Sequence, residues 1–352
     1  MPTHEQYIQR CIQLALLGAG KVSPNPMVGA VLVYEDKIIG EGWHREYGQA
    51  HAEVNCIRSV AAEDRQLIAQ STIYVSLEPC AHWGRTPPCA DLIVESKIPK
   101  VVIGCTDTFS EVSGKGIEKL KQASIEVIIG ILEKECRQLN RRFFTRQEQR
   151  RPYIILKWAE SADGFIAPEQ GKRVMLSNRF SQKLVHKMRS EEDAILVGYH
   201  TALLDNPQLN NRYGQGRQPL RIVIDPQLQL PQQLHLFDLS QPTLVLNYLK
   251  EEEKDNLHWV RIDNEQPMVQ QVIDKADKIN SVIVEGGNKT LQQFIDAGLW
   301  DEAFIFQTPH LLQNGTKAPL LKQALLQEQY QLQTDKVNRY YHEHTAALYP
   351  FQ

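Results

Sequence analysis

Three short elements in the first half of the chain carry side chains that bind metal ions. They are His51-Ala52-Glu53, Glu78-Pro79-Cys80, and Cys89, which follows nine residues after Cys80. One imidazole and two thiolates are good zinc ligands, and a catalytic zinc has three protein ligands and an open position for water. Such a zinc lowers the pKa of its bound water toward ~7. We therefore predict one zinc per chain, held by His51, Cys80 and Cys89, with Glu53 as the catalytic acid and base that carries a proton from water to leaving ammonia.

Each element alone has a simpler interpretation, because a lone His usually satisfies a core hydrogen bond and a lone Cys usually packs as a small hydrophobic residue. A structural zinc would need a fourth ligand, for which His44 and His82 are the local candidates. A His-x-Glu followed by Pro-Cys and a second Cys is the pattern of zinc deaminases. In that pattern two residues separate the cysteines, whereas here Ala81 to Pro88 lie between them.

The elements that must position these residues alternate between strand and helix patterns, which predicts a layered α/β fold. In the first half we expect helices at 5–17 and 52–61 and strands at 28–34, 37–42, 71–77, 101–105 and 127–131. The second half repeats the alternation, with strands expected at 153–158, 194–197, 221–224, 243–246, 281–284 and 303–307 and helices at 179–189 and 289–297. Two glycine-containing stretches, 18–21 and 114–116, are similar to phosphate loops but complete neither a dinucleotide fingerprint nor a Walker motif.

A basic segment separates the two halves. Residues 137–151 contain six arginines beside Phe143-Phe144. Basic residues with aromatics can grip RNA, but we interpret the segment as a surface helix that passes into a linker. Because 352 residues exceed one typical domain, we predict a deaminase domain at 1–148 and a second domain at 149–352.

Composition excludes several classes of protein. A formal net charge of −3 disfavours a nucleic-acid-coating protein. No apolar stretch approaches the ~20 residues that cross a bilayer, and the polar start of the chain lacks a signal-peptide pattern. Six cysteines in 352 residues are not a disulfide framework. We expect a cytoplasmic enzyme with no membrane or nucleic-acid partner.

Two motifs of the first half identify a family. Residues 78–89 (EPCAHWGRTPPC) and 24–29 (PNPMVG) resemble the deaminase half of the bifunctional riboflavin-biosynthesis deaminase/reductases. The resemblance implies a cytidine-deaminase-like, three-layer α/β/α domain whose substrate is a diaminopyrimidinone carrying ribose 5-phosphate. It also implies that Asn25 and His44 hold the pyrimidine and sugar and that His82 lies near the pocket mouth. From the local sequence alone, Asn25 would be a turn residue between two prolines.

The second half resembles the reductase half of the same family, which is itself similar to dihydrofolate reductase. The matching motifs include 156–159 (LKWA), 161–164 (SADG), 194–198 (AILVG), 205–207 (DNP) and 285–287 (EGG). The resemblance implies a dihydrofolate-reductase-like α/β domain in which NADPH reduces the ribosyl side chain to ribityl. The apolar strand that runs into Gly286-Gly287 and a helix would bring backbone N–H groups close to a pyrophosphate; a plain strand-to-helix connection is the alternative.

Site residues of the reductase follow from the resemblance by position. The cofactor would contact Ala159, Met175, Thr201, Asp205, Gly287, Asn288, Lys289, Thr290, Leu291, Gln292 and Gln293. The substrate would contact Lys157, Arg173, Arg189, Leu209, Arg212 and Glu285. Arg189 and Arg212 suit a phosphate, which guanidinium groups clasp with paired hydrogen bonds, although Arg189 alone is also interpretable as a solvated surface charge.

The chain departs from the family at a few positions. Met175 stands where tryptophan is common beside the cofactor, Glu160 where a small residue is usual, and Ser110 within a stretch that usually has an asparagine-proline pair. The family commonly forms homo-oligomers, which we expect here. Two rival functions stay open on sequence alone: a nucleic-acid deaminase with an accessory domain, and a scaffold with one inactive half.

Overall fold

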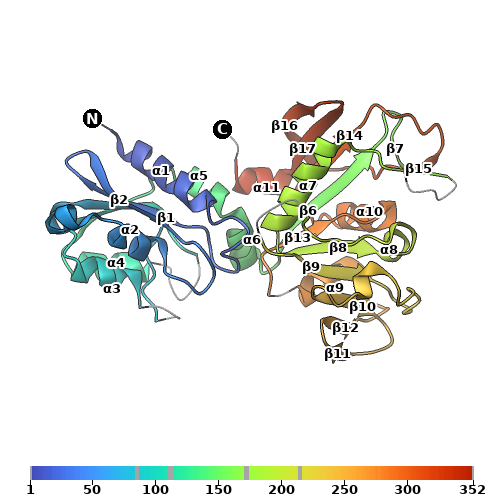
Figure 1. Ribbon diagram of the computed structural model, residues 1–352, viewed down its shortest axis with the longest axis horizontal. Helices are drawn as coiled ribbons and strands as arrows, with labels where there is room; N and C mark the ends of the chain where they lie inside the picture. Colours follow the sequence, from blue (N-terminus) through green and yellow to red (C-terminus); the bar gives the residue numbers. More distant parts are fainter. Residues whose placement is uncertain are drawn as a thin grey trace. The chain divides into compact units, whose positions relative to one another are not determined.

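The computed structural model describes residues 2–83, 87–108, 114–169, 174–212, 216–276 and 278–350. The chain divides into two compact units, residues 1–150 and 151–352 (Figure 1). This division lies two residues beyond residue 148, where the sequence predicts the domain boundary. Among the described residues, no helix has both the length and the apolar character needed to cross a bilayer.

The first unit is built on a five-stranded sheet in the order β2-β1-β3-β4-β5. Its strands are β1 (Gly29–Tyr34), β2 (Lys37–Trp43), β3 (Thr72–Leu77), β4 (Lys100–Cys105) and β5 (Glu126–Ile129). The β1–β2 hairpin and the β1–β3 pair are antiparallel, whereas β3, β4 and β5 run parallel. Parallel strands are usually covered by helices on both faces, which explains the nearly continuous apolar runs in β3 and β4.

Helices form layers on both faces of this sheet (Figure 1). They are α1 (His4–Leu16), α2 (Ala52–Arg58), the 3₁₀ helix Ala62–Gln70, α3 (Cys89–Glu95), α4 (Lys115–Gln122), α5 (Glu133–Leu139) and α6 (Arg141–Gln149). A Cβ on Gly29 would lie 2.0 Å from the Cys11 carbonyl oxygen of α1, and a Cβ on Gly42 would lie 2.2 Å from the Cys56 nitrogen of α2. These glycines therefore permit close contact between the hairpin and the helices. The three-layer α/β/α prediction is confirmed.

The arginine-rich segment is helical up to the division between the units, as predicted, but α6 packs into the first unit and is not a surface helix alone. Residues 137–149 form the end of α5 and all of α6 within the first unit. Phe144 and Thr145 are fully buried, and Phe143 is 8% exposed. The guanidinium of Arg137 lies 4.4 Å from the centre of the Phe144 ring and bonds Glu148 at 2.6 Å. Composition suggested a surface helix because the arginines lie around an apolar face that the linear sequence hides.

The second unit is built on a ten-stranded sheet in the order β11-β12-β10-β9-β8-β13-β6-β14-β17-β16. Its strands are β6 (Tyr153–Glu160), β8 (Ala194–Gly198), β9 (Leu220–Ile224), β10 (Thr243–Asn247), β11 (Glu252–Lys254), β12 (Leu257–Arg261), β13 (Ser281–Val284), β14 (Glu302–Gln307), β16 (Ala324–Leu332) and β17 (Asp335–His342). A separate pair joins β7 (Phe165–Pro168) to β15 (Gly315–Lys317). Sequence patterns missed β7, β11, β12 and β15 to β17, several of which are short or largely exposed.

Helices of the second unit cover both faces of its sheet. They are α7 (Arg179–Glu191), α8 (Tyr199–Asp205), the 3₁₀ turn His235–Phe237, α9 (Met268–Lys275), α10 (Asn288–Asp296) and α11 (Glu343–Leu348). Met188 of α7 packs with Tyr153, Ile155 and Ile283. The larger core on the other face includes Val272 of α9 and Phe294 of α10.

The strand order of the second unit reverses at its centre. After β6, the chain moves outward through β8, β9, β10 and β12, and then returns to place β13 between β8 and β6. These central strands are parallel, so their carboxyl ends meet at one edge. In open α/β sheets, ligands bind beyond the carboxyl ends at such a reversal.

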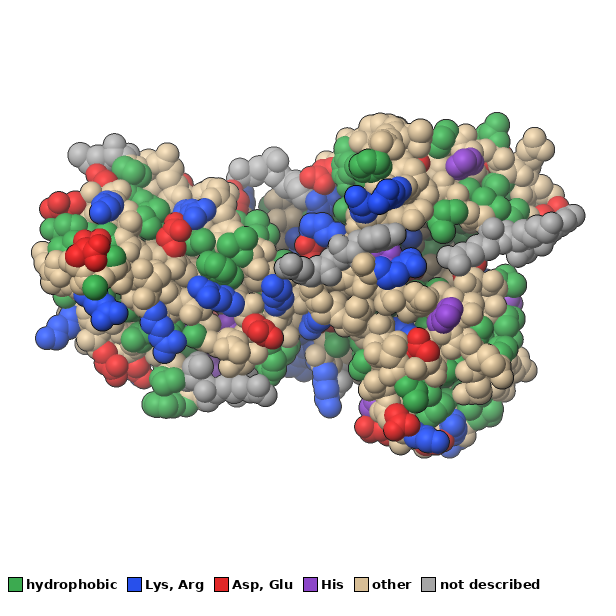
Figure 2. Space-filling view, in the orientation of Figure 1, with side chains coloured by type: hydrophobic (Ala, Val, Ile, Leu, Met, Phe, Trp, Pro, Cys, Tyr) green, Lys and Arg blue, Asp and Glu red, His purple; other side chains and the backbone are tan. Residues whose placement is uncertain are grey.

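Charged side chains are mixed on the visible surface. On the face in Figure 2, Lys and Arg are interspersed with Asp and Glu over both units. This distribution agrees with the small net charge.

Candidate active sites

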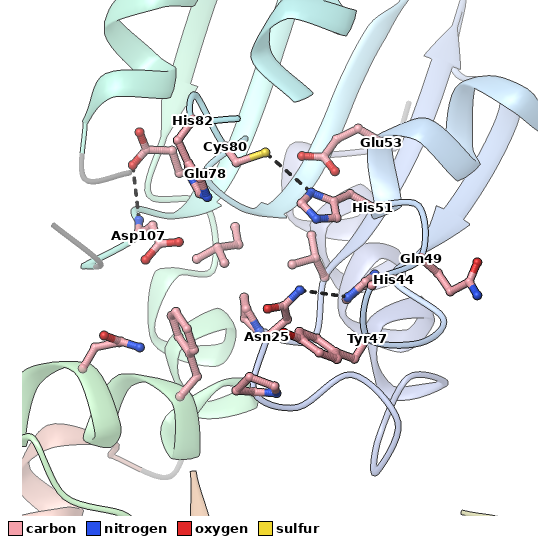
Figure 3. A pocket seen from close by; sticks show the side chains of 17 residues that line it. Asn25, His44, Tyr47, Gln49, His51, Glu53, Glu78, Cys80, His82 and Asp107 are labelled. Atoms are coloured by element: carbon pink, nitrogen blue, oxygen red, sulfur yellow. Dashed lines mark hydrogen bonds between the residues drawn. The ribbon is translucent and has the colours of Figure 1, made fainter. Parts of the chain in front are cut away.

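The three predicted zinc ligands come together in the first unit. His51 immediately precedes α2, Cys80 follows β3, and Cys89 begins α3. Nδ1 of His51 lies 3.5 Å from Sγ of Cys80 and 3.4 Å from Sγ of Cys89. All three ligand atoms lie within 4.8 Å of one another. In Figure 3, Cys80 and His51 point toward each other at one end of the pocket.

The chemistry of this group fits zinc. Soft thiolates together with imidazole select zinc among common metal ions. Within the part of the chain that the structure describes, the group contains three possible ligands, so a fourth position is left for water. A hydrogen bond from Cys89 lowers the pKa of the Cys80 thiol, and the same bond raises the pKa of Cys89.

Glu53 lies beside these ligands. It occupies the first turn of α2, two residues after His51, and lines the same pocket (Figure 3). Glu53 is only 3% exposed, and this burial raises the pKa of its carboxyl group. The carboxyl group can therefore exchange protons with a reactant in a site largely shielded from bulk water.

Asn25 and His44 meet on the wall of the pocket. Nδ2 of Asn25 lies 3.4 Å from Nε2 of His44. His44 Nδ1 lies 3.2 Å from the carbonyl oxygen of Ala50, which can only accept, so Nδ1 carries the proton and Nε2 is free to accept. Burial lowers the pKa of His44, consistent with this neutral form. His82, predicted near the pocket mouth, is half-buried and also lines the pocket.

The pocket has a volume of about 390 Å³, within the range typical of small-molecule sites. Its lining adds residues that sequence reasoning did not assign to the site: Pro24, Pro26, Val28, Tyr47, Gly48, Gln49, Leu77, Glu78, Asp107, Phe143 and Gln147. Glu78 and Asp107 follow parallel strands β3 and β4. Their position after strand ends was a usable signal, whereas nothing local indicated Phe143 or Gln147.

Glu78, two residues before the zinc ligand Cys80, binds backbone groups that follow β4 and that begin α4. Its carboxylate accepts N–H groups from Asp107 at 3.3 Å, Gly114 at 3.1 Å, Gly116 at 3.1 Å and Ile117 at 3.4 Å. The stretch 114–116, similar to a phosphate loop in sequence, thus binds an anion supplied by the chain itself. A helix N-terminus favours such a negative group.

In the second unit, Glu285 joins two of the predicted substrate residues. Its carboxylate accepts two hydrogen bonds from Arg189, at 2.9 and 2.7 Å, and lies 3.6 Å from Nζ of Lys157. Burial raises the pKa of Glu285, but the charges of Arg189 and Lys157 outweigh burial and bring it to about 2. The Arg189 side chain is only 13% exposed. The alternative of a solvated surface charge is therefore wrong for Arg189.

Two of the three remaining predicted substrate residues of this unit, Arg212 and Leu209, differ in exposure. Arg212 is exposed and available to an anionic ligand, whereas Leu209 is 2% exposed and packs in the core. Nε and Nη2 of Arg189 donate to Glu285, and Nη1 donates to the Asn210 carbonyl oxygen, so each nitrogen of this guanidinium already has a partner in the chain. Arg173, also predicted to contact substrate, lies outside the described residues.

His186 holds the segment that carries Leu209 and Arg212. Its Nδ1 accepts the backbone N–H of Arg212 at 3.2 Å, while Arg189, one turn later on α7, donates to the Asn210 carbonyl oxygen at 3.3 Å. His186 is 3% exposed. Burial, followed by the charges of Arg189 and Arg212, lowers its pKa to about 4 against an opposing effect of Glu285.

We expect this histidine to make stability depend on pH. An unfolded histidine titrates near 6.5, so the unfolded state binds more protons below that pH and folding stability falls as pH falls toward 4. Between pH 7 and pH 5 we expect His186 to lower the free energy of unfolding by about 2 kcal/mol. Urea unfolding of the second unit at both pH values should show that loss in the wild type and a smaller one in His186→Gln. His258→Gln, at a half-exposed position, is the control; an equal pH dependence in all three proteins would contradict the assignment.

The predicted cofactor residues divide between the carboxyl edge and the core. Ala159 lies near the end of β6, Thr201 lies in α8 after β8, and Gly287 follows the end of β13. Thr201 Oγ1 accepts the Gly287 N–H at 2.7 Å. Leu291 is buried in the core, Thr290 is 8% exposed, and Gln292 bonds the Leu320 N–H through its side-chain oxygen. The other predicted residues are half-buried or exposed: Asp205, Asn288, Lys289, Gln293 and Met175.

The paired glycines have different surroundings. A Cβ on Gly286 would lie 2.5 Å from the Gly198 nitrogen, so this glycine permits β13 and β8 to end side by side. A Cβ on Gly287 would meet only the Thr201 hydroxyl oxygen, at 3.1 Å. Gly287 therefore lies at the open edge before α10, where a dinucleotide phosphate can approach the backbone, and the site fits NADPH.

Comparisons with known proteins identify the two domains of the chain. Residues 1–105 match the family described as the cytidine and deoxycytidylate deaminase zinc-binding region, and residues 152–344 match the RibD C-terminal domain. The riboflavin biosynthesis protein RibD of Aquifex aeolicus is 36% identical over 95% of this chain and 94% of that protein. The Escherichia coli protein of the same name is 33% identical, with 88% of each chain covered.

Solved structures give the same result over the whole chain. A diaminohydroxyphosphoribosylaminopyrimidine deaminase/5-amino-6-(5-phosphoribosylamino)uracil reductase from Thermotoga maritima is 34% identical, with a TM-score of 0.88 over 96% of this chain and 98% of that one. RibD of Acinetobacter baumannii is 32% identical, with a TM-score of 0.86 over the same shares. Together with the two sites, these matches show that the chain belongs to the RibD family of riboflavin-biosynthesis enzymes, which join a zinc deaminase to a reductase.

Proposed function

We propose that the first unit removes one amino group from a diaminopyrimidinone ribosyl 5-phosphate and that the second unit then reduces the ribosyl chain to ribityl with NADPH. The observation that carries the first step is the convergence of His51, Cys80 and Cys89 within 4.8 Å beside buried Glu53. The resemblance of the whole chain to a deaminase/reductase from Thermotoga maritima supports the order and the substrate. We assign the deaminase domain to residues 1–148 and the reductase domain to residues 149–352.

In the deaminase site, His51, Cys80 and Cys89 would hold a zinc ion, which would lower the pKa of a water molecule. Glu53 takes a proton from the attacking water as that water adds to the ring carbon that carries the amino group. Glu53 then gives the proton to the amino nitrogen, so that the carbon–nitrogen bond breaks and ammonia leaves. Asn25 and neutral His44 orient the ring by hydrogen bonds, and the enclosed pocket restricts access of other water.

In the reductase site, bound NADPH would supply a hydride to the anomeric carbon of the sugar. The bond between that carbon and the sugar's ring oxygen breaks, and the released oxygen takes a proton from water and becomes a hydroxyl group of the ribityl chain. Residues at the carboxyl edge, including Ala159, Thr201, Asp205 and Gly287, hold the cofactor. Glu285, fixed by Arg189 and Lys157, orients polar groups of the sugar, and Arg212 is placed to bind the substrate phosphate. Because Arg189 is already paired, we assign it a role in fixing Glu285 before any contact with substrate.

The remaining assignments are those of a metabolic enzyme. We infer a cytoplasmic homo-oligomer whose partners are small molecules. Interspersed surface charge supports the absence of a nucleic-acid partner. A gel-shift titration with single-stranded RNA should show no complex at physiological salt; tight binding would favour the nucleic-acid deaminase instead.

We expect one tightly held zinc per chain. Cys80→Ser should lose it, because hydroxyl is a poor substitute for thiolate among zinc ligands. Elemental analysis of protein purified at neutral pH gives the measurement. Cys11→Ala, at a buried cysteine that bonds Tyr74 rather than the pocket, should keep the metal. Zinc retained by Cys80→Ser, or absent from the wild type, would contradict the ligand assignment.

A further inference from the structure

The helix pair α5–α6 forms part of the deaminase pocket although it lies beyond residues 1–105, which match the deaminase zinc-binding region. Phe143 and Gln147, both from α6, line the cavity that contains His51 and Cys80. Residues four apart lie on the same face of a helix. In Figure 3 the green α5–α6 segment lies across the pocket from the Cys80–His51 pair.

A side-chain clasp fixes this helix pair to the loop that carries Asn25. Asn140 lies between α5 and α6 and is 3% exposed. Its Oδ1 accepts the Met27 N–H at 2.8 Å, and its Nδ2 donates to the Met27 carbonyl oxygen at 2.9 Å. Both ends of one amide therefore bond one residue, two positions after Asn25. A buried, fully satisfied pair of this kind specifies a single arrangement.

The neighbouring face of α6 anchors the helix in the unit. Phe144 is fully buried and packs edge-on against Phe143, with ring centres 5.6 Å apart. The bond between Arg137 and Glu148 braces α5 against α6. These contacts hold the helix without using the Gln147 amide, which lies at the pocket.

We propose that α6 determines the substrate specificity of the deaminase site, with Gln147 binding hydroxyl groups of the substrate's sugar and Phe143 packing against its carbon atoms. The inference rests on the proposed function. The reacting amino group must lie near Glu53 and the zinc ligands, with the ring held by Asn25 and His44. A substituent on that ring then extends toward the other wall. A glutamine amide both donates and accepts, which matches hydroxyl groups that do the same.

The test measures binding rather than turnover. Zinc-loaded Glu53→Gln protein, in which catalysis is slowed, is compared with Glu53→Gln/Gln147→Leu by titration calorimetry. The two probes are the diaminopyrimidinone ribosyl 5-phosphate and the free diaminopyrimidinone base, which lacks the sugar. Gln147→Met serves as a second variant, and Gln9→Leu, at an exposed position of α1, is the matched control. Leucine and methionine preserve helix propensity.

We expect both Gln147 variants to weaken binding of the ribosyl phosphate by about tenfold, or 1.4 kcal/mol, with the affinity for the free base and the zinc content unchanged. Equal affinity for the ribosyl phosphate in the Gln147 and Gln9 variants would overturn the inference while leaving the deaminase assignment intact. An equal loss for both probes would also overturn it, because Gln147 would then act on the ring or the fold. If the Glu53→Gln protein binds neither probe, the proposed deaminase substrate is wrong and the inference fails with it.

Discussion

Glu53→Gln is expected to lower the rate of ammonia release by on the order of 10²- to 10⁴-fold, the usual contribution of a positioned acid–base group. Glutamine has nearly the same shape as glutamate, so it fits the buried position of Glu53 in α2. It cannot take a proton from the attacking water and return it to the leaving nitrogen. Ammonia release from the diaminopyrimidinone ribosyl phosphate, measured without NADPH, gives the rate.

Two further measurements make this result specific to proton transfer. Zinc content should stay at one per chain, since Glu53 is not a ligand, and reduction of supplied deaminated substrate should continue at the wild-type rate. Glu63→Gln, at an exposed position of the 3₁₀ helix, should release ammonia normally. Full deaminase activity in Glu53→Gln would exclude Glu53 as the proton carrier.

Gly287→Val is expected to weaken NADPH binding by at least about a hundredfold, or ~2.7 kcal/mol. A branched side chain here would press on the Thr201 hydroxyl, 3.1 Å from the first added carbon, and would extend over the edge where phosphate should approach the backbone. Binding is measured by the change in NADPH fluorescence during titration. Ammonia release should be unchanged, so the deaminated ribosyl intermediate should accumulate.

The control for Gly287→Val adds the same side chain at the opposite end of α10. Ala297→Val lies at an exposed position that follows the last turn of this helix. It should bind NADPH as the wild type does, and both variants should keep the wild-type melting temperature within a few degrees. Normal NADPH affinity in a folded Gly287→Val protein would place the cofactor elsewhere.

Local sequence predicts two kinds of feature here: side chains whose combined chemistry has few uses, and strands with long apolar runs. His51, Glu53, Cys80 and Cys89 can be grouped from the sequence alone because their side-chain types have few uses together. The central strands are also predictable, since β3, β4, β8 and β13 are buried on both faces and read as continuous apolar runs. Exposed strands such as β16, buried on neither face, carry no such pattern.

The site features that could not be predicted from local sequence depend on contacts between residues far apart in the chain. Asn140 bonds Met27, which lies 113 residues earlier, and this contact positions the arginine-rich segment so that Phe143 and Gln147 line the pocket. The sequence predicts Arg189 as a phosphate ligand, yet its partner Glu285 lies 96 residues later. The family resemblance predicts that Leu209 contacts the substrate and that Leu291 contacts the cofactor, but both side chains are buried in the core. Pairings over such separations are set by the fold rather than by neighbouring residues.

The central claim, two separate active sites in one chain, is tested most directly by mixing the two inactive variants. Zinc-loaded Gly287→Val should supply deaminated intermediate, and Glu53→Gln should reduce it. The measurement is NADPH oxidation with the diaminopyrimidinone ribosyl phosphate as the only substrate. We predict oxidation in the mixture, at a rate that rises with the amount of Gly287→Val, and almost none with either variant alone. A mixture of two folded, zinc-loaded variants that oxidises no NADPH would contradict the account.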